Sequence, residues 1–357
     1  MMIQTFSSTI RRKEMDAVLT CMVDEKLGPG ELNAKLIQTV KEFTGCDGAV
    51  AFRSPAIAFS YVLKALALEE GSAVMVSALA PSWHYSAVKN LGFNPLVLDV
   101  EEDTGLVSAA AVQEGVKQGG RLLLLHETMG IMPNLEEILA IGVPVIEDIS
   151  HSLGSVYNFS PSEENPSAKP EDLQKKAGMM GLYSILGLEA NDTVTAGGGA
   201  VLISPKRREW IVLKKFTDEA PETDILPDMN SALGFIQLKE YARNEEVRKS
   251  LYAIFQKALQ SGKNKTFARP AESPSTVWSF PVVLNGSFKD ARQYASRKEI
   301  EIRPAYEGSV ISLLSDEEQS KYIHGKALFL RTVLFPLYPR LGSEAATKIA
   351  KVLGTLP

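Results

Sequence analysis

An acidic residue and a missing lysine limit the chemistry that residues 143–204 could perform. Asp148 ends the apolar run VPVIED, where a partly buried carboxylate could hold a protonated nitrogen or cap the following turn. No lysine occurs at positions 177–205. A lysine can form a Schiff base with an aldehyde and then move the proton, so that nucleophile and base are one group. Glu189 stands in this stretch instead, and a carboxylate cannot form an imine.

Seven apolar runs of strand length accompany helical patterns in the first 204 residues. The runs lie at 48–53, 72–79, 95–100, 121–127, 143–149, 179–185 and 198–204. The helical patterns among the early runs lie at 31–43, 55–68, 83–92 and 134–142. Strands that are apolar on both faces and separated by helices indicate a mostly parallel sheet covered on both sides. The predicted fold class is therefore α/β, with one seven-stranded, mostly parallel sheet in a large domain.

The rest of the chain predicts a second, smaller domain. A long helical stretch at 231–260 leads into it, and two strand-like segments and a closing helix follow, which indicates an α+β domain. We expect a large domain over 1–245 and a small one over 246–357. Residues 158–176 are rich in proline, serine and charge, which predicts an exposed insertion.

Composition excludes several classes of protein. A chain of 357 residues with a net charge of −5 has no basic surface for nucleic acid. Its apolar runs are far shorter than the roughly 20 residues that span a bilayer, and we expect no signal peptide because no apolar run follows the two arginines near the start. The two cysteines predict neither a disulfide framework nor a metal cluster, so no metal is expected. A reducing cytoplasm is the expected location.

Five segments, in order, resemble motifs of the DegT/StrS-type sugar aminotransferases. They are LGFNPLVLDVEEDTG, LLLLHETMGIMPNLEEI, VPVIEDISHSLGS, MNSALGFIQLKEYARNEEVRK and VLFPLYPRL. Each segment alone is a weak signal, but the five together cover nearly the whole chain. The resemblance implies the fold type I architecture of enzymes that depend on pyridoxal phosphate, although a fold does not establish an activity. It also implies a homodimer and a nucleotide-linked sugar as the ligand.

The resemblance assigns most of a cofactor site. Asp148 matches the carboxylate that pairs with the pyridine nitrogen, and His151 matches the residue beside the ring oxygen. Ser54 and Ser184 match phosphate-binding serines. Tyr85 takes the place of the aromatic residue that stacks on the ring, although packing beneath a loop is the favoured alternative. An alternative for Asp148 is that it binds backbone amides in an empty site.

The same resemblance assigns substrate contacts to His126, Arg303 and Tyr306. His126 belongs to the segment that matches the family's H-x-x-G strand. Arg303 and Tyr306 lie in EIRPAYEG, which resembles the small-domain segment that closes over a nucleotide sugar.

Several expected cofactor contacts are replaced. Glu189 stands where the family places its Schiff-base lysine, five residues after the phosphate-binding serine. Pro55 and Ala56 replace the glycine and threonine of the phosphate loop, which removes an amide donor and a hydroxyl. The segment 223–226, Thr-Asp-Ile-Leu, replaces the family's N-Y-R-M arm, which reaches the neighbouring subunit's phosphate.

The sequence leaves three hypotheses open. The chain could be a degenerate family member that keeps the dimeric fold and a ligand cleft but does not transaminate. It could use pyridoxal or pyridoxamine phosphate differently, as the family's dehydratases do, with Glu189 as a base in the biosynthesis of polysaccharides or cell-surface sugars. Finally, it could be a standard aminotransferase that recruits Lys175 or Lys176.

Overall fold

The computed structural model describes residues 2–161, 169, 173–269 and 275–357. Most of the predicted insertion, namely 162–168 and 170–172, lies outside the described residues. Within the described ranges, no helix is both long enough and apolar enough to cross a bilayer.

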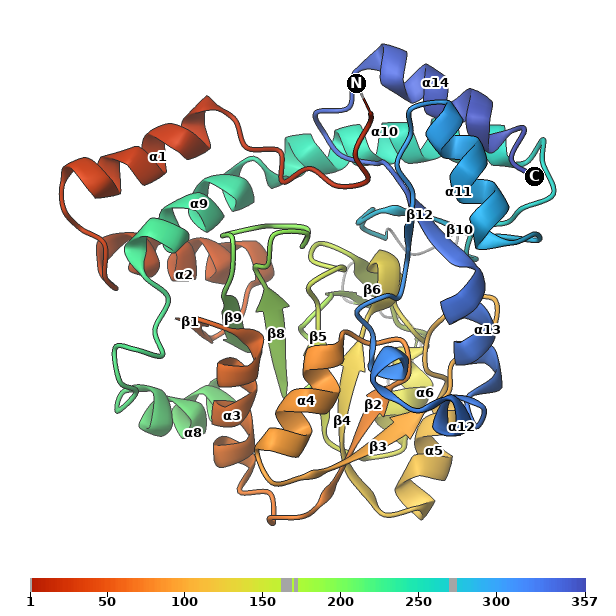
Figure 1. Cartoon of the computed structure of the whole chain (residues 1–357). Coiled ribbons are helices and arrows are strands. Elements are labelled where there is room, and N and C mark those ends of the chain that lie inside the picture. The colour runs from red at the N-terminus through yellow and green to blue at the C-terminus, as the bar shows by residue number, and fades with distance from the viewer. Residues whose placement is uncertain (1, 162–168, 170–172, 270–274) are drawn as a thin grey trace.

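The large sheet has seven strands in the order β1-β9-β8-β5-β4-β2-β3 (Figure 1). The strands are β1 (Gly48–Phe52), β2 (Ala73–Ser77), β3 (Asn94–Leu98), β4 (Gly120–His126), β5 (Val145–Asp148), β8 (Tyr183–Gly187) and β9 (Ala200–Ser204). Only β9 pairs antiparallel with its neighbours in this sheet, and the other pairings are parallel. Each strand coincides with a predicted apolar run, so the predicted α/β fold class is confirmed.

Alternate residues of the central strands face two different layers of helices. Leu122 and Leu124 pack with the cluster beneath α3 (Pro55–Leu66), α4 (Ser82–Asn90) and α8 (Arg207–Thr217). Leu123 and Leu125 pack with the cluster that includes α2 (Glu31–Thr44), α5 (Ala109–Lys117) and α6 (Leu135–Ala140). Because both faces are covered, an unbroken apolar run is what a central parallel strand requires.

A second core lies at the other end of the molecule. It is built around a three-stranded antiparallel sheet in the order β10-β12-β11. Its strands are β10 (Phe280–Val283), β11 (Arg303–Pro304) and β12 (Thr332–Phe335), and the neighbouring helices are α10 (Tyr241–Leu259), α11 (Phe288–Arg297) and α14 (Ser343–Leu353). Helix α10 runs without interruption through residue 245, where the sequence predicts a domain boundary. The position of that boundary therefore stays a prediction.

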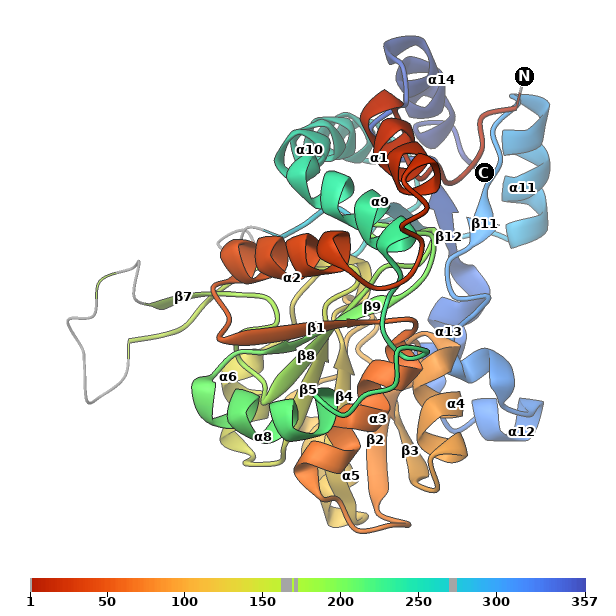
Figure 2. The same ribbon diagram turned by 90° about the vertical axis from the view of Figure 1, so that its left-hand side faces the viewer.

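The remaining elements complete the fold. They are α1 (Arg12–Val23), η1 (Thr128–Gly130), α9 (Asp228–Lys239), η2 (Val310–Leu313), α12 (Asp316–Gln319), α13 (Ile323–Arg331) and the ribbon β6 (Val156–Asn158) with β7 (Gln174–Lys176). Figure 2 shows this ribbon projecting from the body of the molecule. The predicted helix at 231–260 is two helices, α9 and α10, that meet at Glu240.

Candidate functional site

Three side chains from different elements meet beneath a pocket at the carboxyl ends of the parallel strands. Asp148 ends β5, His126 ends the neighbouring strand β4, and His84 enters from α4. The Asp148 Oδ2 atom lies 2.7 Å from His84 Nε2 and 3.0 Å from His126 Nδ1. All three side chains are buried. Ligand sites of open α/β sheets lie at this edge, because the loops that follow the strands diverge there.

The second carboxylate oxygen of Asp148 is held by the turn that follows β5. Ser150 donates its backbone N–H at 3.1 Å and its hydroxyl at 2.5 Å to Oδ1. Burial opposes the charge on Asp148, but the nearby histidines outweigh burial and hold its pKa well below the usual range. Burial lowers the pKa of His84 despite the attraction of Asp148. The carboxylate is therefore ionised beside a neutral His84, and its oxygens already have partners.

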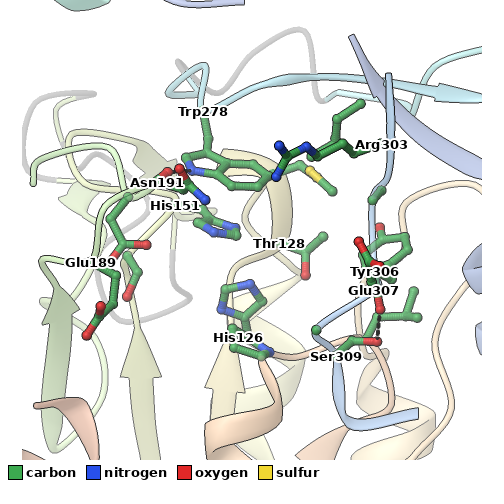
Figure 3. A pocket seen from close by; sticks show the side chains of 18 of the residues that line it. His126, Thr128, His151, Glu189, Asn191, Trp278, Arg303, Tyr306, Glu307 and Ser309 are labelled. Carbon is green, nitrogen blue, oxygen red and sulfur yellow. Dashed lines mark hydrogen bonds between the residues drawn. The ribbon is translucent and has the colours of Figure 1, made fainter. Parts of the chain in front are cut away.

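Above this floor lies a cavity of about 350 Å³ between the two cores. In Figure 3, Glu189, Asn191 and His151 lie on one side, and Tyr306, Glu307 and Ser309 lie on the other. Small-molecule sites usually occupy roughly 300–1,000 Å³, so this cavity can hold a compact ligand such as one sugar ring.

An aromatic pair covers one end of the cavity. Trp278, from the segment that leads into β10, stacks on His151 with ring centroids 3.7 Å apart and an interplanar angle of 16°. The indole Nε1 donates to the Asn191 carbonyl at 2.7 Å, which fixes the ring plane. Burial lowers the pKa of His151 well below its ordinary value, so the stacked imidazole is neutral. Trp83 lines the cavity as well, so two indoles border the ligand space.

Glu189 lies on the loop after β8 and lines the cavity. Its backbone N–H donates to Asp192 Oδ2 at 2.7 Å. Although Asp192 is only partly covered, desolvation raises its pKa to about 8, which keeps it largely protonated at neutral pH. Among the described residues, no lysine lines this cavity. The loop therefore presents carboxyl groups where an amine would be needed for a Schiff base.

The structure brings most of the predicted site residues together. Glu189, His151, His126, Arg303 and Tyr306 all line the cavity, and Asp148 lies directly beneath His126. The guanidinium of Arg303 is exposed and pairs with Glu301 at 3.0 Å. Burial raises the pKa of Tyr306, so its phenol stays neutral.

Three predicted cofactor residues do not line the cavity. The Ser54 hydroxyl caps α3 by accepting the Ile57 N–H at 3.2 Å. The Ser184 hydroxyl donates to the Gly178 carbonyl at 2.9 Å and is fully buried. Tyr85 packs against the core beneath α3 and α4, which agrees with the packing alternative.

The two lysines of the third hypothesis lie on the exposed strand β7. Lys176 donates to the Phe43 carbonyl, and neither Lys175 nor Lys176 lines the cavity. The structure therefore places neither amine where it could form a Schiff base in the cavity.

The residues present do not fit pyridoxal phosphate held as a Schiff base. A pyridine nitrogen could reach Asp148 only if His84, His126 or Ser150 gave up its hydrogen bond. At the start of α3, Pro55 lacks an N–H, and the next two amides are Ala56 and Ile57, of which Ile57 is taken by Ser54.

The fold and the position of the cavity define the class of protein, namely a fold type I aminotransferase-like protein. The DegT/DnrJ/EryC1/StrS aminotransferase family matches residues 8–354, so the chain belongs to this family. The family consists of sugar aminotransferases and dehydratases that depend on pyridoxal phosphate, and the resemblance expected from the motifs is confirmed.

Individual relatives are distant in sequence and close in fold. The putative pyridoxal phosphate-dependent aminotransferase EpsN of Bacillus subtilis is 24% identical over 308 residues, which cover 78% of this chain and 74% of EpsN. A putative sugar aminotransferase, Spr1654 from Streptococcus pneumoniae, matches in its pyridoxal phosphate form with a TM-score of 0.84 and 16% identity, over 97% of this chain and 96% of that one. A GDP-4-keto-6-deoxymannose-3-dehydratase with bound GDP-perosamine matches with a TM-score of 0.83 and 16% identity, over 98% of this chain and all of that one (100%).

Sequence reasoning missed three members of the site. His84, Trp278 and Asn191 were not assigned a role in binding. His84 stands between two aromatic residues, and only the phase of α4 decides which of the three points to Asp148. Trp278 lies about 130 residues from His151 in sequence, and no local pattern links positions so far apart.

Proposed function

We propose that this chain is a family member that does not transaminate and that keeps a cleft for a nucleotide-linked sugar. The observation that carries the proposal is the cavity wall itself, where Glu189 stands in place of an amine. Without a primary amine at the cavity, an aldehyde cofactor has no covalent attachment and the reaction has no proton shuttle. The hydrogen bonds that occupy Asp148 support the same conclusion, because this carboxylate is not free for a ring nitrogen.

The aromatic walls of the cavity and the arginine at its rim support a sugar nucleotide as the ligand. Two indoles border the cavity, and sugar rings present C–H faces that pack on aromatic rings. Arg303, at the rim, is the cation placed to contact a diphosphate. The bound GDP-perosamine of the dehydratase relative suggests the probe to use.

Calorimetric titration with GDP-perosamine tests the ligand class. We expect binding, and we expect Arg303→Gln to weaken it by about tenfold or more, because a charge-assisted contact contributes roughly 1.5–3 kcal/mol. Arg208→Gln is the matched control, since Arg208 is exposed on α8 and does not line the cavity. Absence of binding, or equal losses in the two variants, would contradict this part of the proposal.

A second candidate rests on the position of Glu189 in the cavity wall. Glu189 lines the cavity, where it could serve as a base for a sugar-modifying enzyme that holds pyridoxal or pyridoxamine phosphate noncovalently. Such an enzyme would act as a dehydratase or aminotransferase on polysaccharide precursors. Noncovalent, saturable binding of pyridoxamine phosphate to the purified protein would favour this candidate over the first.

We also propose a homodimer, on the evidence of an exposed apolar face on α1. Its outward residues are Met15, Leu19, Met22 and Val23, and Leu27 follows in the next loop; each is at least 51% exposed. Figure 2 shows α1 lying beside α9. The opposite face of α1 packs on α9 through the buried Glu14 and Cys21. A free surface of this kind is typical of a subunit interface. Light scattering should give a dimer for the native chain and a monomer for Leu19→Glu with Met22→Glu, and a native monomer would refute the proposal.

A further inference from the structure

We propose that His84, His126 and Asp148 form a binding site for a first-row divalent transition metal ion such as Zn²⁺. The proposal rests on the arrangement of these side chains and is independent of the proposed function. The three residues come from α4, β4 and β5, which meet only in the folded chain. Each offers one ligand atom, and these atoms all lie within 4.8 Å of one another.

The spacing of the ligand atoms suits a metal ion after a small outward movement. Bonds from Zn²⁺ to nitrogen and oxygen are about 2.0–2.2 Å long, which places neighbouring ligand atoms about 3.0–3.5 Å apart. The Asp148 oxygen lies 2.7 Å from one nitrogen and 3.0 Å from the other. Shifts of a few tenths of an ångström, with each imidazole carrying its proton on the other ring nitrogen, would convert the two hydrogen bonds into two coordination bonds.

The surrounding residues hold the carboxylate in an orientation that suits a ligand. Ser150 engages only Oδ1, through its N–H and its hydroxyl, so Oδ2 is the atom turned toward both imidazoles. The His84 ring is fixed against Trp83, with ring centroids 4.3 Å apart. Outer contacts of this kind, which orient the ligands, are a regular part of metal sites in proteins.

The chemistry of the donor set selects the kind of ion. Two imidazoles with one carboxylate suit zinc, iron, cobalt or nickel, whereas magnesium and calcium prefer oxygen ligands throughout. The Asp148 carboxylate is fully buried, and a cation in contact with it would offset the unfavourable burial of its charge.

The position of the cluster gives the ion a connection to the cavity. Three protein ligands leave at least one coordination position for water or for an oxygen atom of a ligand. His126 and Ser150 line the cavity, so the ion would lie under its floor. There it could polarise a carbonyl or hydroxyl oxygen of a bound molecule.

Cobalt substitution tests the proposal with the metal alone as the probe. The full-length protein is treated with a chelator, dialysed and titrated with Co²⁺, and then Zn²⁺ is used to displace the Co²⁺. We expect visible absorption bands of nitrogen- and oxygen-bound cobalt that saturate at about one ion per chain. Elemental analysis of the protein loaded with Zn²⁺ should give the same ratio.

Histidine variants supply the controls, because the chain has only four histidines. His84→Gln and His126→Gln should each weaken Zn²⁺ binding by about 100-fold or more, since each removes one of three protein ligands. His324→Gln should bind like the native chain, because His324 is exposed on α13. Circular dichroism checks that each variant is folded. If the native chain binds no cobalt or zinc, or if folded His84→Gln and His126→Gln bind as tightly as His324→Gln, the carboxylate is simply hydrogen-bonded and the proposal is wrong.

Discussion

Glu189→Lys would place a primary amine on the cavity-lining loop after β8, and we expect this variant to leave pyridoxal phosphate largely unbound at micromolar concentration. The reason is the phosphate site, which the substitution does not repair. Ala56 has no hydroxyl, Ile225 stands where the family places an arginine, and Pro55 has no N–H. Ile225 is instead in a short antiparallel bridge with Phe52.

The size of the deficit follows from the missing contacts. A hydrogen bond to a charged group contributes about 1.5–3 kcal/mol, so the missing hydroxyl and guanidinium together cost roughly 3–6 kcal/mol. That range corresponds to about two to four decades in the dissociation constant. An amine alone should therefore give an aldimine only at cofactor concentrations far above those that a native family enzyme would need.

Absorbance titration measures this deficit directly. Pyridoxal phosphate is added to Glu189→Lys and to a second variant that also carries Ala56→Thr and Ile225→Arg. Only the second should develop the visible aldimine band at micromolar cofactor, and thermal unfolding checks that both variants are stable. A yellow Glu189→Lys protein with transaminase activity would show that the phosphate site is intact, and our reasoning about it would be wrong.

Three further predictions concern the walls of the cavity and their support. Trp278→Ala should lower the affinity for GDP-perosamine by about tenfold, and Trp278→Phe should lower it by less. The reason is that loss of an aromatic contact costs about 0.5–1.5 kcal/mol beyond the lost buried area. Equal affinity of Trp278→Ala and the native chain in a calorimetric titration would show that the indole does not contact the ligand. Gly130→Ala should lower the free energy of unfolding in urea by more than about 3 kcal/mol. Gly130 has a φ of +78°, and a Cβ there would lie 2.1 Å from the Thr276 carbonyl oxygen. The control Gly142→Ala, with a φ of +80° and open space around its Cβ, should cost only about 1–2 kcal/mol. Desolvation raises the pKa of Asp192 to about 8, so between about pH 4 and pH 8 the folded chain binds more protons than the unfolded chain. The protein should therefore lose stability as the pH rises through that window. Asp192→Asn should flatten this part of the plot of unfolding free energy against pH, and an unchanged slope would contradict the raised pKa.

The sequence predicted the seven strands well because all except the edge strand β3 are almost fully buried, and β3 is also largely apolar. An apolar run such as 121–127 has few alternatives in a soluble chain, so local composition determines the element. The ribbon of β6 and β7 was not predicted, because Gln174–Lys176 is exposed and charged and pairs only with its partner strand. The predicted helix at 231–260 was right in type, but its division at Glu240 was not visible in the pattern.

The candidate site was predictable where its residues follow strands and carry family motifs. Asp148 and His126 end adjacent parallel strands, so both had to lie at one edge of the sheet. The hydrogen bond that joins His84 to Asp148 could not be predicted, because it depends on how α4 is rotated about its axis. The stacking of Trp278 on His151 depends on how the second core meets the first, which is a long-range property of the fold.

Borohydride reduction followed by peptide mass spectrometry tests the central claim most directly, namely that this cavity has no amine for a Schiff base. The native protein is incubated with excess pyridoxal phosphate, reduced, digested and searched for pyridoxyl-lysine. We predict no visible aldimine band and no stoichiometric adduct on any lysine, while GDP-perosamine still binds the same preparation. A stoichiometric reduced adduct on a single lysine, together with a visible aldimine band before reduction, would contradict the account.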